Sequence, residues 1–174
     1  MNDDIRSRML REATRLFAQR GYGSTSVRQL VEATGVTKPT LYYHFGSKEG
    51  LFVATATAHL DHFDAMTERA LAAGEDLETQ LADLMAAHIG YAVDHPDTIR
   101  FLMTCLHQVD HGQPEIDLMS IDTTLMRHLG TAFEQARDRG ELDPAVDVPT
   151  AVLSYLGVLR AWALAAFHGL PLAD

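Results

Sequence analysis

The chain of 174 residues is poor in the residue types that mark several classes of protein. A single cysteine, Cys105, excludes an internal disulfide and is compatible with a reducing compartment. Met1 leads directly into polar and charged residues, so we expect no secretory leader and a cytoplasmic protein. The sequence has no glycine-rich phosphate-binding loop, and neither its serines nor Cys105 have the local sequence of a nucleophile. These absences predict a protein that is not an enzyme and needs no cofactor.

Basic residues are also scarce, but they are concentrated at one end of the chain. The totals are 14 lysines and arginines against 24 aspartates and glutamates, a net charge of −10. Residues 1–50 hold 8 of the basic and 5 of the acidic residues, which leaves 6 basic and 19 acidic residues for positions 51–174. This asymmetry predicts that only the N-terminal segment contacts phosphate groups. DNA would repel the acidic remainder, which favours one docking orientation.

Two short helices joined by a tight turn are predicted within the basic segment. Ser26 and Gln29 have the spacing of a capping box, which starts the first helix. Gly35 can take the left-handed conformation that ends it. Thr37 is a candidate N-cap for the second helix, and Pro39 falls in its first turn, where a missing N–H costs nothing. The pattern is typical of a helix-turn-helix.

The second of these helices, residues 38–45, is expected to have one buried and one exposed face. Leu41 and Phe45 lie one turn apart and can face a core. The outward residues carry hydrogen-bond donors and aromatic rings: Lys38, Thr40, Tyr42, Tyr43 and His44. In a helix-turn-helix, the second helix enters the major groove of DNA. Lys38 could then read a guanine base.

The rest of the chain also has helical periodicity, which predicts an all-α fold. We expect an N-terminal helix-turn-helix module of three helices followed by a C-terminal helical bundle. We expect the DNA-binding domain to cover residues 1–47 and the C-terminal domain residues 48–174. The other expected helices cover residues 5–20, 47–72, 76–94, 115–139 and 150–168, with a shorter helix ahead of Gly112.

The last expected helix is apolar around most of its circumference, and Arg160 is its one charged residue. Its length alone would admit a membrane span, but a central arginine argues against that, and we expect no membrane partner. Such a helix must be covered by its own core or by a partner. Gly157, Ala161 and Ala165 repeat every four residues and allow close helix packing, which favours a homodimer. The predicted dimerisation residues are Val152, Tyr155, Leu156, Gly157, Leu159, Ala161 and Trp162.

Two segments, GVTKPTLYYHFGSKEGLF and LREATRLFAQRGYGSTSVRQL, carry a family resemblance. The first is similar to the DNA-binding signature of the TetR family of bacterial transcriptional regulators, and the second resembles that family's first helix and following loop. Together they fall within residues 8–52. The resemblance implies a homodimer that binds a near-palindromic double-stranded DNA operator. It implies DNA contacts by Arg28, Thr37, Lys38, Pro39, Thr40, Tyr42, Tyr43, His44 and Lys48, with Arg6 and Arg8 near the phosphate backbone.

The C-terminal helices are rich in methionine, which suits either an ordinary core or a cavity for varied apolar molecules. The family resemblance implies such a cavity in a C-terminal ligand-binding and dimerisation bundle, and we expect an apolar or amphipathic small-molecule effector. The predicted lining combines apolar side chains with a few polar ones: Phe63, Met66, Met85, His88, Met103, His107, Asp122, Met126 and Trp162.

The histidines leave one further alternative. His59 and His62 are three residues apart, and His107 and His111 are four apart, so either pair could supply two metal ligands from one helix face. No third ligand can be picked out from the sequence. Polar positions at an interface or a pocket wall explain the same histidines, and no metal site is assigned.

Three hypotheses follow for the function. The favoured one is a DNA-binding transcriptional repressor that a small-molecule ligand releases from its operator. The ligand would favour one pose of the helix at residues 47–72 through its differential affinity for the two poses. The second hypothesis keeps DNA binding without a ligand, and the third is a metal-dependent enzyme that uses the histidines.

Overall fold

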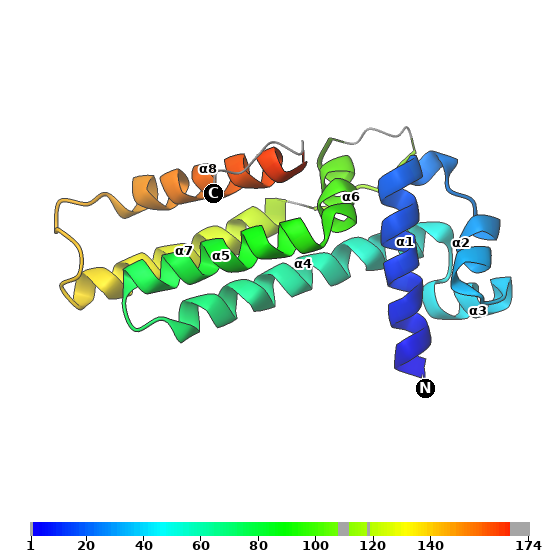
Figure 1. Ribbon diagram of the computed structural model, residues 1–174, viewed down its shortest axis with the longest axis horizontal. Coiled ribbons are helices and arrows are strands. Elements are labelled where there is room, and N and C mark those ends of the chain that lie inside the picture. Colours follow the sequence, from blue (N-terminus) through cyan, green and yellow to red (C-terminus); the bar gives the residue numbers. More distant parts are fainter. Residues whose placement is uncertain (1, 108–111, 118, 168–174) are drawn as a thin grey trace. The chain divides into compact units, whose positions relative to one another are not determined.

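The regular elements of this computed structural model are all helices over the residues that it describes, 2–107, 112–117 and 119–167. The expected all-α fold is confirmed (Figure 1). Side chains are described for these residues except 2–4, 106, 107, 119–122, 166 and 167. The helices are α1 (Asn2–Ser24), α2 (Val27–Thr34), α3 (Lys38–Phe45), α4 (Lys48–Ala73), α5 (Leu77–Asp94), α6 (Pro96–His107), α7 (Met119–Asp138) and α8 (Val148–Phe167).

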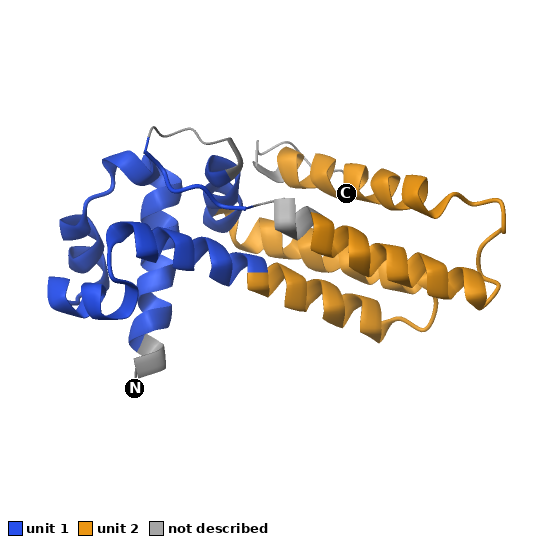
Figure 2. Ribbon diagram, turned by 180° about the vertical axis from the view of Figure 1, so that it is seen from behind, with its two compact units in different colours: residues 1–60, 97–118 blue, residues 61–96, 119–174 orange. Residues whose placement is uncertain are grey.

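Packing divides the chain into two compact units (Figure 2). Unit 1 contains residues 1–60 and 97–118, and unit 2 contains residues 61–96 and 119–174. Helix α4 begins in unit 1 and ends in unit 2, whereas α6 belongs to unit 1 from its second residue onward. The predicted boundary after residue 47 separates a DNA-binding domain from a ligand-binding and dimerisation domain. The two packing units do not test this functional division, so it stays a prediction.

Helix caps form at the start of α2 and at the turn between α2 and α3, where the sequence predicts them. Gln29 N donates to Ser26 Oγ at 3.3 Å and Ser26 N donates to Gln29 Oε1 at 2.8 Å, which completes the capping box. Gly35 ends α2 with a φ of 68°. Thr40 N donates to Thr37 Oγ1 at 3.4 Å and so caps α3. Because these contacts satisfy backbone groups that a helix end leaves unpaired, they fix where α3 begins.

The core of unit 1 is built around aromatic rings from three helices. The ring centroid of Phe52 in α4 lies 5.1 Å from that of Phe17 in α1 and 5.2 Å from that of Phe101 in α6. All three phenylalanines are fully buried, and so is nearly all of Cys105 in α6. Tyr22 adds a fourth ring, 5.0 Å from Phe52. Aromatic packing therefore holds α6 against the first helices of the chain.

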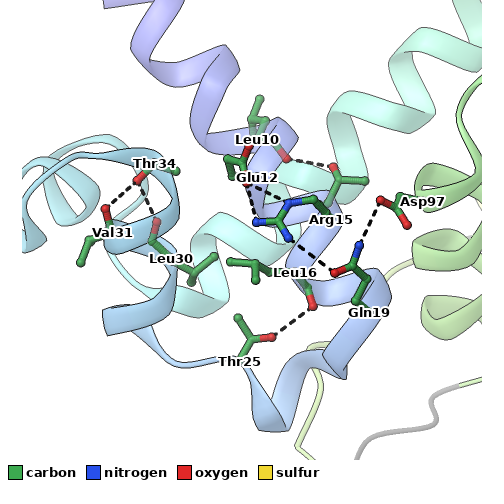
Figure 3. A network of polar contacts seen from close by, with 11 residues as sticks. Leu10, Glu12, Arg15, Leu16, Gln19, Thr25, Leu30, Val31, Thr34 and Asp97 are labelled. Atoms are coloured by element: carbon green, nitrogen blue, oxygen red, sulfur yellow. Dashed lines mark hydrogen bonds and ion pairs between the residues drawn. The ribbon is translucent and has the colours of Figure 1, made fainter.

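Polar contacts reinforce unit 1 around this core (Figure 3). The buried hydroxyl of Thr25 donates to the Gly21 carbonyl at 2.7 Å and lies 3.4 Å from the Leu16 carbonyl, and both contacts tie the loop after α1 back onto that helix. Gln19 Nε2 donates to Asp97 Oδ2 at 3.5 Å and links α1 to α6 at the surface. The hydrogen bond of the buried Thr25 hydroxyl contributes more to stability than that of Gln19, since an exposed hydrogen bond of 3.5 Å competes with water.

Unit 2 is a bundle of the end of α4 with α5, α7 and α8 (Figure 2). Val152 and Leu156 of α8 and Leu129 of α7 are buried in its core. The Tyr155 hydroxyl donates to the Leu81 carbonyl at 2.7 Å and ties α8 to α5. By length and composition alone, the stretch Val148–Ala165 could also span a membrane. Of this stretch, 22% is buried, and α8 packs against α5 and α7.

The expected start of the helix at residue 115 is wrong. Residues 113–117 are not helical, and α7 begins at Met119. Ile116 packs against the core of unit 1, whereas α7 belongs to unit 2. Gln113 Nε2 also donates to the Thr104 carbonyl at 3.3 Å. Tertiary contacts thus hold this segment as a connection that the local sequence does not reveal.

Replacing Gly50 with alanine should destabilise the turn between α3 and α4. A Cβ at this position would lie 2.0 Å from the carbonyl oxygen of Phe45, the last residue of α3. We expect Gly50→Ala to lower the free energy of unfolding by about 1–3 kcal/mol, measured by urea denaturation. Gly90→Ala is the matched control, because a Cβ there meets nothing within 4 Å in α5. Equal midpoints for the two variants would contradict the close approach.

Candidate nucleic-acid interface

Helix α3 has the two faces that its sequence predicts. Leu41 is 1% exposed, whereas Tyr42 and Tyr43 are 47% and 80% exposed. Lys38 and Pro39 at the start of the helix are exposed as well. Large aromatic rings that project into solvent beside a lysine form a surface suited to contact with a polar partner.

The first turn of α3 gathers hydrogen-bonding groups. The hydroxyls of Thr37 and Thr40 lie 2.9 Å apart, and Thr37 is exposed. The first backbone N–H groups of a helix and its dipole both attract anions. With the Lys38 ammonium in the same turn, this end of α3 can bind a phosphate group.

Arg28 is the second residue of α2, and its side chain is exposed. Its Nε donates to Glu32 Oε1 at 2.7 Å, which forms an ion pair between residues one helical turn apart. This pair raises the pKa of Arg28, through the hydrogen bond first and the charge of Glu32 second. Exposed pairs of this kind contribute little to stability, so Arg28 can exchange its partner for a phosphate at low cost.

Lys48 is placed differently from the other predicted DNA contacts. Its Nζ donates to the carbonyls of Tyr22 and Thr25 at 2.9 and 3.1 Å. The same ammonium lies 3.9 Å from the centroid of the Tyr22 ring, a cation–π contact. Lys48 therefore holds the loop between α1 and α2 in this structure, and its phosphate contact stays a prediction.

The two arginines near the start of α1 also differ from each other. Arg6 is exposed, and its guanidinium carbon lies 5.6 Å from the centroid of the Phe45 ring at the end of α3. The Nε atom of Arg8 is buried. Arg6 therefore places a positive charge beside α3, and a backbone contact by Arg8 would have to use its terminal nitrogens.

The predicted ligand residues fall into both units. Met103 belongs to unit 1, and the side chains of His107 and Asp122 lie outside the described residues. The ring centroids of Phe63 and His88 lie 5.4 Å apart in unit 2, and His88 Nε2 lies 3.1 Å from Thr67 Oγ1. The other predicted lining residues are also in unit 2: Met66, Met85, Met126 and Trp162. The structure brings Phe63 and His88 together, and the rest of the lining stays a prediction.

The predicted dimerisation residues mix the two faces of α8. Val152, Leu156 and Leu159 are buried within unit 2, and Tyr155 is bound to α5, so these side chains are not on the free face. Gly157 and Ala161 are exposed, and Trp162 is half-buried. The sequence reasoning missed the large exposed side chains of α8: Leu153, Val158 and Leu164.

The histidine pairs considered as metal ligands have other contacts. His59 Nε2 lies 2.8 Å from Thr14 Oγ1 within unit 1, and the His62 ring packs on Tyr91 within unit 2, with centroids 4.6 Å apart. The side chain of His107 and all of His111 lie outside the described residues. A different group was missed, formed by Asp64, Glu68 and His128. The four-residue spacing of its two carboxylates is visible in the sequence, but nothing there indicates the distant histidine.

Comparison with known proteins places this geometry in a family. Residues 9–55 match the model described as bacterial regulatory proteins, tetR family. The chain is 35% identical over 172 residues to the HTH-type transcriptional repressor ComR of Escherichia coli K12, a match that covers 96% of this chain and 81% of ComR. The chain belongs to the TetR family. The predicted family is confirmed, and the protein is a DNA-binding transcriptional regulator rather than an enzyme.

Solved structures of TetR-type regulators share the fold. PfmR from Thermus thermophilus superposes on this chain with a TM-score of 0.72 at 27% identity. The match covers 90% of this chain and 85% of the PfmR chain. FadR from Bacillus subtilis, solved in complex with stearoyl-CoA, superposes with a TM-score of 0.73. The match covers 94% of this chain and 88% of the FadR chain. Its identity of 17% shows the fold alone.

Lys48→Met should reduce stability, because it removes the Nζ donor from the carbonyls of Tyr22 and Thr25, although the Tyr22 carbonyl keeps the Thr25 N–H at 3.3 Å. We expect a loss of about 1–3 kcal/mol in the free energy of unfolding, measured in urea. Lys38→Met is the control, because Lys38 is exposed and the change should stay within about 0.5 kcal/mol. If the Lys48 variant has the same free energy of unfolding as the wild type, then Lys48 does not stabilise the loop between α1 and α2.

Unit 2 should lose stability on acidification through His88. Burial lowers the pKa of His88 from 6.5 to about 4, because its surroundings penalise the charged ring. The unfolded chain binds this proton at higher pH, so the stabilisation is complete above pH 6.5 and is lost as the pH falls toward 4. The loss is about 3 kcal/mol in total.

The His88 contribution can be separated from that of other groups by a variant. His88→Gln removes the titrating ring and keeps a hydrogen-bonding group near Thr67. Urea midpoints measured from pH 7 to pH 4 should fall less steeply for this variant than for the wild type. Parallel curves for the two proteins would show that His88 does not carry the effect.

Proposed function

We propose that this TetR-family protein is a homodimeric repressor whose two α3 helices enter the major groove of a near-palindromic operator. The exposed polar face of α3 is the observation that carries the proposal. Tyr42, Tyr43 and Lys38 project from it, while Leu41 anchors the opposite face. The name of ComR as a transcriptional repressor supports repression as the mode of action.

The proposed DNA-reading domain is residues 1–47. Arg28 and the first turn of α3 would contact phosphates, and the outward side chains of α3 would reach base edges. The proposed contacts are Arg28, Thr37, Lys38, Pro39, Thr40, Tyr42, Tyr43 and His44. Lys48 would join them only by leaving the loop carbonyls that it binds. A regulator that works on chromosomal DNA is expected in the cytoplasm.

The proposed dimer uses the exposed face of α8. The side chains of Leu153, Val158 and Leu164 are exposed on α8, as are Gly157 and Ala161. A second copy with the same exposed apolar side chains would cover this face, since the commonest oligomers are two-fold symmetric dimers. The two-fold symmetry would also match the two half-sites of the operator.

The proposed effector is an apolar or amphipathic small molecule bound in residues 48–174. Methionines such as Met66, Met85 and Met126 can adapt to such a molecule. FadR of the same fold was solved with stearoyl-CoA, which is amphipathic. Because α4 runs from unit 1 into unit 2, its pose is the proposed route from effector to DNA. The effector must bind the two poses with different affinities to shift their populations.

Selection of bound sequences from a random pool of DNA duplexes tests the repressor proposal. We expect two-fold symmetric sites with half-sites about 10 base pairs apart or a multiple of that. Lys38→Ala should then weaken operator binding by about 1–3 kcal/mol and relax the preference at one base position. Arg137→Ala, an exposed position on α7 in unit 2, is the control and should leave affinity unchanged. A pool without enrichment, or an unchanged affinity for the Lys38 variant, would contradict the proposal.

A further inference from the structure

Two carboxylates and one imidazole converge within unit 2. Asp64 and Glu68 lie on successive turns of α4, and His128 reaches them from α7. His128 Nε2 lies 2.9 Å from Asp64 Oδ1 and 3.9 Å from Glu68 Oε1. The three possible ligand atoms all lie within 4.8 Å of one another. Residues far apart in the sequence thus place one nitrogen and two oxygen donors around one point.

The cluster combines a fixed histidine with two more mobile carboxylates. The side chain of His128 is 14% exposed, so its surroundings in unit 2 restrict its ring. Glu68 is 62% exposed and can rotate toward the histidine at low cost. Solvent therefore has access from the carboxylate side, which gives an ion a path into the cluster.

A simple ion pair leaves this arrangement unbalanced. Two carboxylates four residues apart on one helix repel each other. A single histidine can offset at most one of the two charges, and the chain after residue 50 already carries 19 acidic residues against 6 basic ones. A divalent cation at the convergence point would neutralise both carboxylates.

We propose that Asp64, Glu68 and His128 bind one divalent transition-metal ion. One imidazole nitrogen and two carboxylate oxygens match the three protein ligands that zinc accepts when it keeps a fourth position for water. At bond lengths of about 2.0–2.1 Å, tetrahedral ligand atoms lie about 3.3 Å apart. The two separations from His128 Nε2, 2.9 and 3.9 Å, bracket that value, and the two carboxylate oxygens lie within 4.8 Å of each other, so side-chain rotation, above all of the exposed Glu68, would form the site.

The bound ion would join α4 to α7 inside unit 2. Binding to the folded state alone raises the melting temperature by mass action. Metal binding would be separate from operator binding, because unit 2 would hold the metal whether or not unit 1 is bound to an operator.

Calorimetric titration of the full chain with zinc chloride, after removal of metal with a chelator, tests the site. We expect one ion per chain and a higher melting temperature in its presence. His128→Ala and Glu68→Gln should each weaken zinc binding at least about ten-fold, since even the outer partners of metal ligands are worth that much. Magnesium chloride should not reproduce the effect, because magnesium prefers an all-oxygen shell.

Two matched controls separate this site from general binding by histidines and carboxylates. His95→Ala and Glu78→Gln alter an exposed histidine and an exposed carboxylate of unit 2 outside the cluster, and both should keep the wild-type zinc affinity. The exposed Glu68 variant keeps the test valid even if the half-buried His128 variant fails to fold. Wild-type zinc affinity in Glu68→Gln, or weakening of equal size in the two controls, would overturn the proposal.

Discussion

The ring of Phe52, packed between Phe17 and Phe101, is the contact on which unit 1 depends. Helix α3 has eight residues, too few for a helix that is stable alone in water. It forms because caps set its start, Leu41 anchors one face, and the following turn leads to the buried Leu51 and Phe52 of α4. Burial of a phenylalanine contributes about 1.5–3 kcal/mol. The exposed face of α3 is therefore displayed by a scaffold that is stabilised elsewhere.

The basic end of the chain divides its cations between structure and recognition. Lys48 directs its hydrogen bonds to loop carbonyls, and Arg15 pairs with Glu12 at 2.8 Å. Lys38 and the weakly paired Arg28 remain at the surface beside α3. With so few cations there, backbone N–H groups and threonine hydroxyls at the start of α3 gain weight in holding phosphate. Such a surface depends more on geometry than on net charge.

Local patterns could be predicted from sequence, and contacts between distant segments could not. The caps at Ser26, Thr37 and Asp76 each involve residues three apart, so their spacing is legible in the chain. The unwound segment around Ile116 is set by packing against unit 1, which no local signal reports. The face of α8 that is buried, and the approach of His128 to Asp64, likewise depend on how helices meet.

The buried thiol of Cys105 has a practical consequence for spectroscopy. Burial raises its pKa to about 12, and the thiolate is the reactive form of cysteine. Maleimide dyes and nitroxide labels should therefore leave Cys105 unmodified in the folded chain. A cysteine introduced on the exposed face of α3 would be the site that takes the label. Distances between paired labels would then report the spacing of two recognition helices without any change to the core.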